Sequence, residues 1–514
     1  METINYLEEF RPDLADFRDM TMKFHNKEIT MPEYKGFSGG YGSYAQRFGE
    51  KHMLRLRMAG GRLTKDRLQF IAKSIEKYKI DKVHLTTCQS IQLHNLAAED
   101  VCVLIEEVWD AGMLSRGGGG DYPRNVMASP LSGVAKDEYF DVMPYAEIAA
   151  EYMMRFIKTV KFPRKLKVAF SSSPDNETHA TYRDLGFVAN ADGTFSVYSA
   201  GGLGSNPRLG VKVAEQVAPE DILYYIKAMV DTFVAYGNYE QRSKARTRYM
   251  QETLGTDGYA KAYQEKLEKV FAEEDLKITV EAKEITKSGD GAAIEDKHVI
   301  PQKQEGLYAV YYQPIGGDIA PGKFRQFYEI IKDMEDVELR ITPEEALYFI
   351  NCTAGEAEKI LKATEDGAKT LFETSVACIG NSICQVGARD SQALLHACVE
   401  AVRKENFADG VLPKIHISGC PSSCGTHQTA DIGFRGGMKK TPEKPKPGFV
   451  FFQGGNARQG EEVISEESGA MLLEEIPMFL VELGRCVSKS NLTYDIWIKE
   501  HQAELDALVK KYTE

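Results

Sequence analysis

The stretch RMAGGRLTKDRLQFIAKSIEKYKIDKVHLTTCQSIQLHN at residues 57–95 aligns without gaps, at a shift of 256 positions, with QPIGGDIAPGKFRQFYEIIKDMEDVELRITPEEALYFIN at residues 313–351. The matched residues include Gly60 with Gly316, Gly61 with Gly317, Thr86 with Thr342, and Asn95 with Asn351. Each copy has the pattern of a strand, a Gly-Gly turn, an amphipathic helix and a strand. A second helix is predicted after each copy, at about 98–110 and 354–365. Such a small unit cannot bury both of its faces alone, so we expect the two copies to pack together.

A second repeat follows at a shift of 247 residues. KVAFSSSPDNETHATYRDLGF (167–187) aligns with KIHISGCPSSCGTHQTADIGF (414–434), and Asp184 meets Asp431. Two consistent shifts in the same order predict a molecule with an internal pseudo-two-fold axis. We therefore expect an α+β fold with two small half-domains and two larger α/β lobes.

The domain boundaries follow from these repeats and from an acidic, Gly-containing connector. They are an N-terminal extension (1–45), a first half-domain (46–115), a first lobe (116–271), the connector (272–304), a second half-domain (305–370), a second lobe (371–480) and a C-terminal segment ending in an amphipathic helix (481–514).

Four cysteines stand in two short clips in the second lobe. Cys378 and Cys384 form C-x5-C in CIGNSIC, and Cys420 and Cys424 form C-x3-C in SGCPSSCG. Four thiolates are the ligand set of a [4Fe–4S] cluster. Zinc usually takes narrower clips, often with histidine, and disulfides require an oxidising compartment. Zinc is the alternative interpretation of the four ligands.

The C-x5-C clip followed by G-C-P-x-x-C-G resembles the sulfite/nitrite reductase family, over about residues 50–440. The resemblance implies siroheme coupled to a [4Fe–4S] cluster, with Cys424 as the sulfur shared by the two metal centres. It also implies that the two half-domains are ferredoxin-like. In the first half, Ser173 and Glu177 stand where Cys420 and Cys424 stand in the second. That half should therefore have the cluster loop without the cluster.

Four basic residues match the family's substrate-binding positions: Arg55 in KHMLRLR, Arg124 in GDYPRNV, and Lys165 and Lys167 in PRKLK. Alternation in LRLR puts Arg55 and Arg57 on one face of a strand, whereas their repeat equivalents, Tyr311 and Gln313, are uncharged. Lys165 and Lys167 share a face of the strand predicted over KLKVAF. Two adjacent lysines repel each other and call for an anion between them.

The resemblance also assigns residues to the siroheme: Arg57, Gln92, His94, Asn125, Gly201, Gly202, Gly204, Arg242, Lys244, Arg246 and Arg248. The alternative for residues 242–248 is the basic surface of a helix. Family members usually carry arginine in T-x-R-Q, where this chain has Cys88. One siroheme carboxylate then loses its partner or is paired by another basic residue, unless the tetrapyrrole is a different one. Cys88 itself is either a small packing residue or a reactive thiol.

Composition narrows the partners. The formal net charge is −13, which argues against nucleic acid, and the longest apolar runs are too short for a membrane span. The first residues, METINYLEEFRPD, are too acidic for a signal peptide. Free cysteines and an oxygen-sensitive cluster then favour a reducing cytoplasm. A convincing G-x-G-x-x-G or flavin motif is lacking, so electrons should come from a separate carrier, and ferredoxin is the family's usual donor.

The substrate signals point in two directions. K-x-K resembles the sulfite-reducing members, whereas GN in CIGNSIC and the ADIGF after the second clip resemble the nitrite branch. We give more weight to the residues that would touch substrate, and so expect six-electron reduction of sulfite to sulfide. Reduction of nitrite to ammonia is the first alternative. A non-catalytic siroheme or cluster protein, such as a sensor or an electron-relay subunit, is the second.

Overall fold

The computed structural model describes residues 6–281 and 284–514. Residues 1–5 of the predicted N-terminal extension and residues 282–283 of the predicted connector lie outside the described residues. The chain divides into two compact units: residues 6–202, 208–281, 284–312 and 319–365 form the first, and residues 203–207, 313–318 and 366–514 form the second. Among the described residues, no helix is both long and apolar enough to span a membrane.

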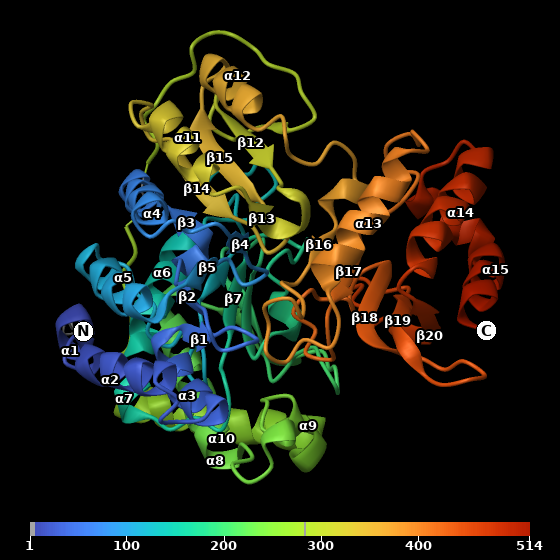
Figure 1. The fold of residues 1–514 in the computed structure, drawn as a ribbon. Helices are drawn as coiled ribbons and strands as arrows, with labels where there is room; N and C mark the ends of the chain where they lie inside the picture. Colours follow the sequence, from blue (N-terminus) through green and yellow to red (C-terminus); the bar gives the residue numbers. More distant parts are fainter. Residues whose placement is uncertain (1–5, 282–283) are drawn as a thin grey trace. The chain divides into compact units, whose positions relative to one another are not determined.

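The two half-domains lie in the first unit except for residues 313–318 of the second copy, and each has a five-stranded sheet (Figure 1). The first copy consists of β1 (Ser43–Ala45), β2 (His52–Leu56), β3 (Arg62–Leu63), α4 (Lys65–Lys77), β4 (Val83–Leu85), β5 (Ile91–Leu96) and α5 (Ala98–Asp110). The second consists of β11 (Val299–Pro301), β12 (Tyr308–Tyr312), β13 (Asp318–Ile319), α11 (Gly322–Ile331), β14 (Glu338–Ile341), β15 (Leu347–Cys352) and α12 (Ala354–Ala363). The strand orders are β1-β2-β5-β4-β13 and β11-β12-β15-β14-β3, so each sheet ends on a short strand from the other copy.

Strand pairing confirms the 256-residue repeat. Arg55 pairs with Gln92 between β2 and β5, and Tyr311 pairs with Tyr348 between β12 and β15. The neighbouring pairs Leu85–Ile91 and Ile341–Leu347 also differ by 256. Register is set by the alternation of buried and exposed side chains, which the two copies share. Equal registers show that the two copies have the same fold, not merely the same pattern.

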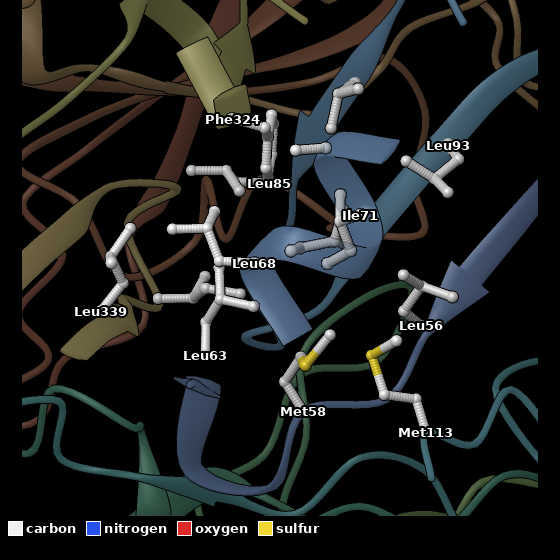
Figure 2. Close-up of a cluster of buried hydrophobic side chains, with 14 of the residues drawn as sticks. Leu56, Met58, Leu63, Leu68, Ile71, Leu85, Leu93, Met113, Phe324 and Leu339 are labelled. Carbon is white, nitrogen blue, oxygen red and sulfur yellow. The ribbon is translucent and has the colours of Figure 1, made fainter. Parts of the chain in front are cut away.

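One hydrophobic core serves both half-domains. Leu63, Leu68 and Leu85 from the first copy join Phe324 and Leu339 from the second, and all five are at most 1% exposed. Figure 2 shows part of this cluster, with α4 contributing Leu68 and Ile71. α4 and α11 pack against each other, and their strong amphipathic patterns explain why. As predicted, neither copy buries its apolar face alone.

Helices from the N-terminal region pack beside the first copy, against α5 and the edge strand β1. α1 (Tyr6–Phe10), α2 (Asp13–His25) and α3 (Met31–Ser38) precede it, and α2 packs against α5.

The Gly-Gly turn needs glycine, since Gly60 has a φ of +56° and a Cβ there would collide with Met143 Sδ. The described residues of the connector between α10 (Thr256–Glu273) and β11, 274–281 and 284–298, contain neither helix nor strand.

Each larger lobe also has a five-stranded sheet. The first lobe, in unit 1, has the order β10-β9-β8-β7-β6 and the second, in unit 2, the order β16-β17-β18-β19-β20. The first lobe comprises β6 (Met127–Ala128), α6 (Met143–Met154), α7 (Phe156–Thr159), β7 (Val168–Ser171), β8 (Leu185–Ala189), β9 (Phe195–Ser199), β10 (Val211–Val217), α8 (Ile222–Tyr236), α9 (Tyr249–Leu254) and α10 (Thr256–Glu273). The second comprises β16 (Val376–Ala377), α13 (Ser391–Arg403), β17 (Ile415–Ser418), β18 (Ile432–Lys439), β19 (Lys446–Gln453), β20 (Glu466–Leu472), α14 (Glu475–Lys489) and α15 (Tyr494–Thr513).

The 247-residue repeat is also visible in the backbone. Val168 pairs with Leu185 in parallel, and Ile415 pairs with Ile432 in the same way. The loops that follow β7 and β17 bend at matched left-handed residues: Asn176 and His179 in one, Ser423 and Thr426 in the other. The first lobe thus has the cluster loop without its cysteines.

Candidate functional site

The four cysteines predicted as cluster ligands follow two neighbouring strands of the second unit. Cys378 comes directly after β16, and Cys420 lies two residues after β17. Because β16 and β17 run in parallel, their loops leave the sheet at the same edge. The fold therefore brings two clips that are distant in sequence to one place.

Hydrogen bonds join the two clips. The backbone N–H of Cys378 donates to the Ile417 carbonyl at 3.1 Å, and the N–H of Gly419 donates to Cys378 Sγ at 3.2 Å. The N–H groups of Ala388 and Arg389 both donate to the Gly419 carbonyl at 2.9 Å. Burial, and then the neighbouring Cys424 sulfur, raises the pKa of Cys378 to about 12. The sulfurs of Cys378 and Cys424 are therefore close enough to interact.

Glycines allow this close approach of the two loops. Gly380 has a φ of +73°, and a Cβ there would lie 2.8 Å from Asp390 Oδ1. A Cβ on Gly425 would collide with the Ile417 carbonyl, and the N–H of Gly425 donates to Ser418 Oγ at 3.0 Å. The loop shape is fixed by the backbone, before any metal contributes.

The donor set fits an iron–sulfur cluster. Within residues 6–281 and 284–514, no group of three or more His, Cys, Asp or Glu side chains is arranged to hold a metal ion. All nine cysteines are free thiols. In a [4Fe–4S] cluster each cysteine binds a different iron, so the sulfurs stand further apart than around one zinc ion. Cys424 is exposed, and the other three cysteines of the two clips are half-buried.

In the first unit, the four predicted substrate residues lie in one group of charges. We call it the basic cluster, and it consists of Arg55, Arg124, Lys165, Lys167, Arg183 and Arg246. Arg55 and Arg124 both donate to the Gly118 carbonyl, at 2.7 Å and 3.0 Å. Arg124 also donates to the Gly120 carbonyl at 2.7 Å, and burial lowers its pKa to about 10. A shared carbonyl thus holds two guanidinium groups side by side.

The two lysines lie just before the strand on which they were predicted. β7 begins at Val168, and between the lysines Leu166 forms an isolated bridge with Pro123. The prediction of a strand through both lysines was therefore wrong. The extended segment still directs both toward one place, because the charges of Lys165 and Lys167 both act on Cys88. The Lys167 ammonium donates to Cys88 Sγ at 3.1 Å.

Asp184 is the carboxylate around which this region is built. It is fully buried and accepts from the Lys167 N–H at 2.9 Å and from Arg246 Nη2 at 3.0 Å. The Thr247 hydroxyl donates to it as well. Burial raises the pKa of Asp184, but Arg246 and Thr247 outweigh burial and the net pKa is below its ordinary value. A charged Asp184 therefore fixes the backbone that carries Lys167.

Several residues assigned to siroheme already have protein partners. Arg57 donates to the carbonyls of Arg116, Pro123 and Arg124, and burial lowers its pKa to about 9. The Asn125 amide donates to the carbonyls of Met58, Cys88 and Gln89 at 2.7, 3.0 and 3.1 Å. Arg57 and Asn125 thus tie loops together. The Gln92 amide lies between His94 Nε2 and Arg55; with its oxygen toward Arg55, it accepts from Arg55 Nε at 3.0 Å.

The basic run 242–248 divides into two pairs. Arg242 pairs with Asp121, and Lys244 pairs with Glu252, both on the exposed surface. Arg246 and Arg248 are more buried, and a Cβ on Gly202 would come within 3.4 Å of Arg248. Gly201 and Gly202 belong to the first unit, and Gly204 belongs to the second. The N–H of Gly204 donates to Gln428 Oε1, and its carbonyl accepts from Gln428 Nε2. Arg242 and Lys244 lie on a short 3-10 helix with exposed side chains, as the alternative of a basic helix surface predicts, whereas Arg246 and Arg248 follow it in a bend and a turn.

Three residues of this region were missed in the sequence. Arg183 is 8% exposed and acts on Cys88, and Arg208 has a buried Nε without a hydrogen-bond partner. Tyr44 accepts from the Gly120 N–H at 2.7 Å, beside Arg124. A signal existed for Arg183, because it stands next to the Asp184 that the second repeat aligns with Asp431.

Comparison with known families decides what these two sites belong to. The family model described as the nitrite and sulphite reductase 4Fe-4S domain matches residues 119–271 and 372–481. The model of the nitrite/sulfite reductase ferredoxin-like half domain matches residues 44–109 and 300–366. The chain belongs to the nitrite and sulphite reductase family. It is therefore an oxidoreductase, and this family carries siroheme and a [4Fe–4S] cluster. The α+β fold with ferredoxin-like half-domains is confirmed.

Relatives of this reductase are named for both anions. It is 25% identical over 431 residues to the chloroplastic ferredoxin–nitrite reductase of Arabidopsis thaliana, covering 79% of this chain and 71% of the relative. It is 23% identical over 444 residues to sulfite reductase [ferredoxin] 1 of Mycolicibacterium paratuberculosis, covering 82% and 77%. Its fold is similar to that of Mycobacterium tuberculosis NirA, with a TM-score of 0.73, 22% identity and coverage of 93% and 92%.

The first unit of this reductase offers groups suited to siroheme. Siroheme carries eight carboxylates, which buried guanidinium groups pair with well. The Nε atoms of Arg124, Arg208 and Arg246 are buried and lack hydrogen-bond partners among the described residues. Gly202, with a φ of +152°, leaves room beside Arg246 and Arg248 for close approach of a flat ligand. These residues fit the group that the family carries.

Proposed function

We propose that this reductase converts sulfite to sulfide, with six electrons from a ferredoxin. The basic cluster carries this proposal, because it gathers four guanidinium and two ammonium groups, and such a concentration of positive charge suits a small oxyanion. Reduction of one sulfite consumes six electrons and seven protons and releases hydrosulfide and three waters. When bound, siroheme and the cluster supply the electrons to the sulfur atom.

We assign roles within this chain as follows. Cys378, Cys384, Cys420 and Cys424 would ligate the cluster, and Cys424 would be the cysteine that the cluster and siroheme share. Arg246 and Arg248 pair with siroheme carboxylates, and Gly202 allows its close approach. Arg55 and Arg124 bind the anion's oxygens through fixed planar forks. Lys165 and Lys167 add compact charge and, being able to give up a proton, can protonate the oxygens that leave as water.

The same comparisons support a ferredoxin as the electron donor. The relatives from plants, a cyanobacterium and a haloarchaeon are named as ferredoxin-dependent enzymes. We infer that a ferredoxin reduces this chain as well. The alternatives of a sensor or relay subunit receive less support, since Arg55, Arg124, Lys165 and Lys167 are all present and gathered in one unit.

Nitrite is the second candidate substrate, and a specific observation favours it. Seven relatives at 25–26% identity, including the enzyme of Spinacia oleracea, are named nitrite reductases. The discriminating feature is the pair Lys165 and Lys167, in which K-x-K suits the doubly charged sulfite ion. Nitrite carries one charge and needs fewer cations to balance it.

Replacement of Lys167 tests the choice of substrate. Lys167→Asn should lower kcat/KM for sulfite more than for nitrite, and change the ratio of the two by about ten-fold or more. The reason is that a lost charge-assisted contact costs about 1.5–3 kcal/mol. Competition assays with a reduced viologen dye measure both substrates in one reaction.

The matched control is Lys161→Asn, which removes an exposed lysine from the same lobe and should leave the ratio unchanged. A wild-type enzyme that strongly prefers nitrite, with a ratio that Lys167→Asn scarcely moves, would refute the sulfite assignment. The basic cluster would then be a nitrite site.

A further inference from the structure

Cys88 occupies a turn whose shape is fixed from several sides. The turn joins β4 to β5, and Thr86 Oγ1 accepts from the N–H groups of Cys88 and Ser90 at 3.4 and 3.2 Å. The Asn125 amide donates to the Cys88 carbonyl at 3.0 Å. On one side the Cys88 side chain packs against the small apolar group Met127, Ala169, Ala180 and Val188. The sulfur position is therefore set by the backbone and by packing.

The other side of the Cys88 sulfur is lined with positive charge. The Lys167 ammonium contacts it at 3.1 Å, and the charges of Arg183, Lys165 and Arg124 also act on it. Burial raises the pKa of the thiol, but these cations outweigh burial and lower the pKa to about 6. The thiolate form is therefore the main form at neutral pH.

The negative charge of Cys88 in turn changes the pKa of Lys167. Burial lowers the pKa of the Lys167 ammonium, and the charges of Arg183 and Arg246 lower it further. A negative charge on Cys88 raises it again. Without that charge, Lys167 would be a half-buried lysine among arginines, and would lose its proton more readily.

The internal repeat supports an anion at this turn. At a shift of 256 residues the equivalent of Cys88 is Glu344, an acid. The turns match in detail, since Thr342 Oγ1 accepts from the N–H groups of Glu344 and Ala346 at 3.1 Å, as Thr86 does from Cys88 and Ser90. The same turn thus presents an acidic side chain in both copies.

We propose that the Cys88 sulfur is a fixed negative charge that holds the Lys167 ammonium in the basic cluster, so that Cys88 is a positioning residue of the reductase. The role in reduction rests on the proposed function, whereas the ion pair itself does not. Cys88 is placed to orient Lys167, which would touch substrate, and to keep it protonated.

Alkylation of the intact holoprotein with iodoacetamide tests the ion pair directly. Under anaerobic conditions, peptide mass spectrometry follows modification of Cys88 as a function of pH. We expect the rate to rise with a midpoint near pH 6, against about 8.5 for an ordinary cysteine. In Lys167→Gln the midpoint should move up by about one unit or more, and in Lys165→Gln by less, because the Lys167 ammonium donates to the sulfur at 3.1 Å and its charge has the larger effect on the Cys88 pKa.

Kinetics test the positioning role separately. In Cys88→Ser, kcat/KM should fall about ten-fold at pH 7, while Cys88→Asp, which keeps the charge, should stay within about three-fold of wild type. A wild-type midpoint at or above about 8.5, or no modification at any pH up to about 9, would overturn the ion pair. Equal activity of the serine and aspartate variants would overturn the positioning role. The alkylation result holds whether or not sulfite is the substrate.

Discussion

Replacement of Cys378 by serine should remove the [4Fe–4S] cluster and abolish reduction of both sulfite and nitrite. A serine hydroxyl does not ionise at neutral pH, and a cluster requires four thiolate ligands. Cys378 also accepts the Gly419 N–H, so its sulfur joins the two clips in addition to its proposed role as an iron ligand. Iron and labile sulfide in the purified protein, together with the cluster's electron paramagnetic resonance signal after reduction, measure the loss. Activity should fall by several orders of magnitude.

Cys486→Ser is the matched control, because Cys486 is a half-buried cysteine on α14 of the same unit and belongs to neither clip. It should keep full iron, sulfide and activity. Cys424→Ser should differ from Cys378→Ser in one respect, since it should also change the siroheme absorption spectrum. A Cys378→Ser protein with a full cluster would contradict the ligand assignment. An unaltered siroheme spectrum in Cys424→Ser would contradict the shared sulfur.

The repeats explain why so much of the fold could be predicted. A gapless shift of 256 residues preserves the alternation of inward and outward side chains, so that Arg55–Gln92 and Tyr311–Tyr348 have the same register. Likewise, the Gly-rich clips predict a sharply bent loop, and Gly380 has a positive φ. These features depend on residues that are near one another in the sequence, so local patterns predict them.

The partners of individual side chains were harder to predict. Alternation in LRLR predicted that Arg55 and Arg57 lie on one face of a strand. Arg57 instead lies beyond the end of β2, and its guanidinium group donates to three backbone carbonyls. Asn125 likewise binds three carbonyls from two other loops. Those carbonyls come from segments about 36–67 residues away in sequence, and no local pattern reveals which donors they will take. Cys88 is the opposite case, since its departure from the family pattern was visible but its contact with Lys167 was not.

Replacement of Asp184 by asparagine should strongly destabilise the first lobe. The carboxylate is fully buried and balances Arg246, which has 17% of its side chain exposed. Removing one partner of a buried pair leaves the other charge uncompensated, at a cost of about 3–5 kcal/mol. At about 2–4 °C per kcal/mol, the thermal midpoint should fall by about 6–20 °C. Calorimetry of the holoprotein measures this shift.

Asp431→Asn is the control that the internal repeat provides. It changes the equivalent residue of the second lobe, where burial raises the pKa of the carboxyl above its ordinary value. The fold there favours the uncharged form, which asparagine resembles, so the midpoint should move little. Equal shifts in the two variants would contradict the special role of Asp184.

The pH dependence of the Asp184 effect follows from the direction of its pKa shift. Its pKa in the folded protein lies below the ordinary value, because Arg246 and Thr247 stabilise the charged form against the opposing effect of burial. A group of this kind contributes stability above its unfolded pKa, near 3.9, and loses that contribution as the pH falls through its folded pKa. The stability difference between wild type and Asp184→Asn should therefore be constant from about pH 5 to 8 and should shrink below about pH 4. A difference that stayed constant down to pH 3 would show that Asp184 acts through packing and hydrogen bonding rather than through its charge. Asp184→Asn should also lower kcat/KM. Asp184 accepts the backbone N–H of Lys167, so its replacement should loosen the segment that positions the Lys167 side chain.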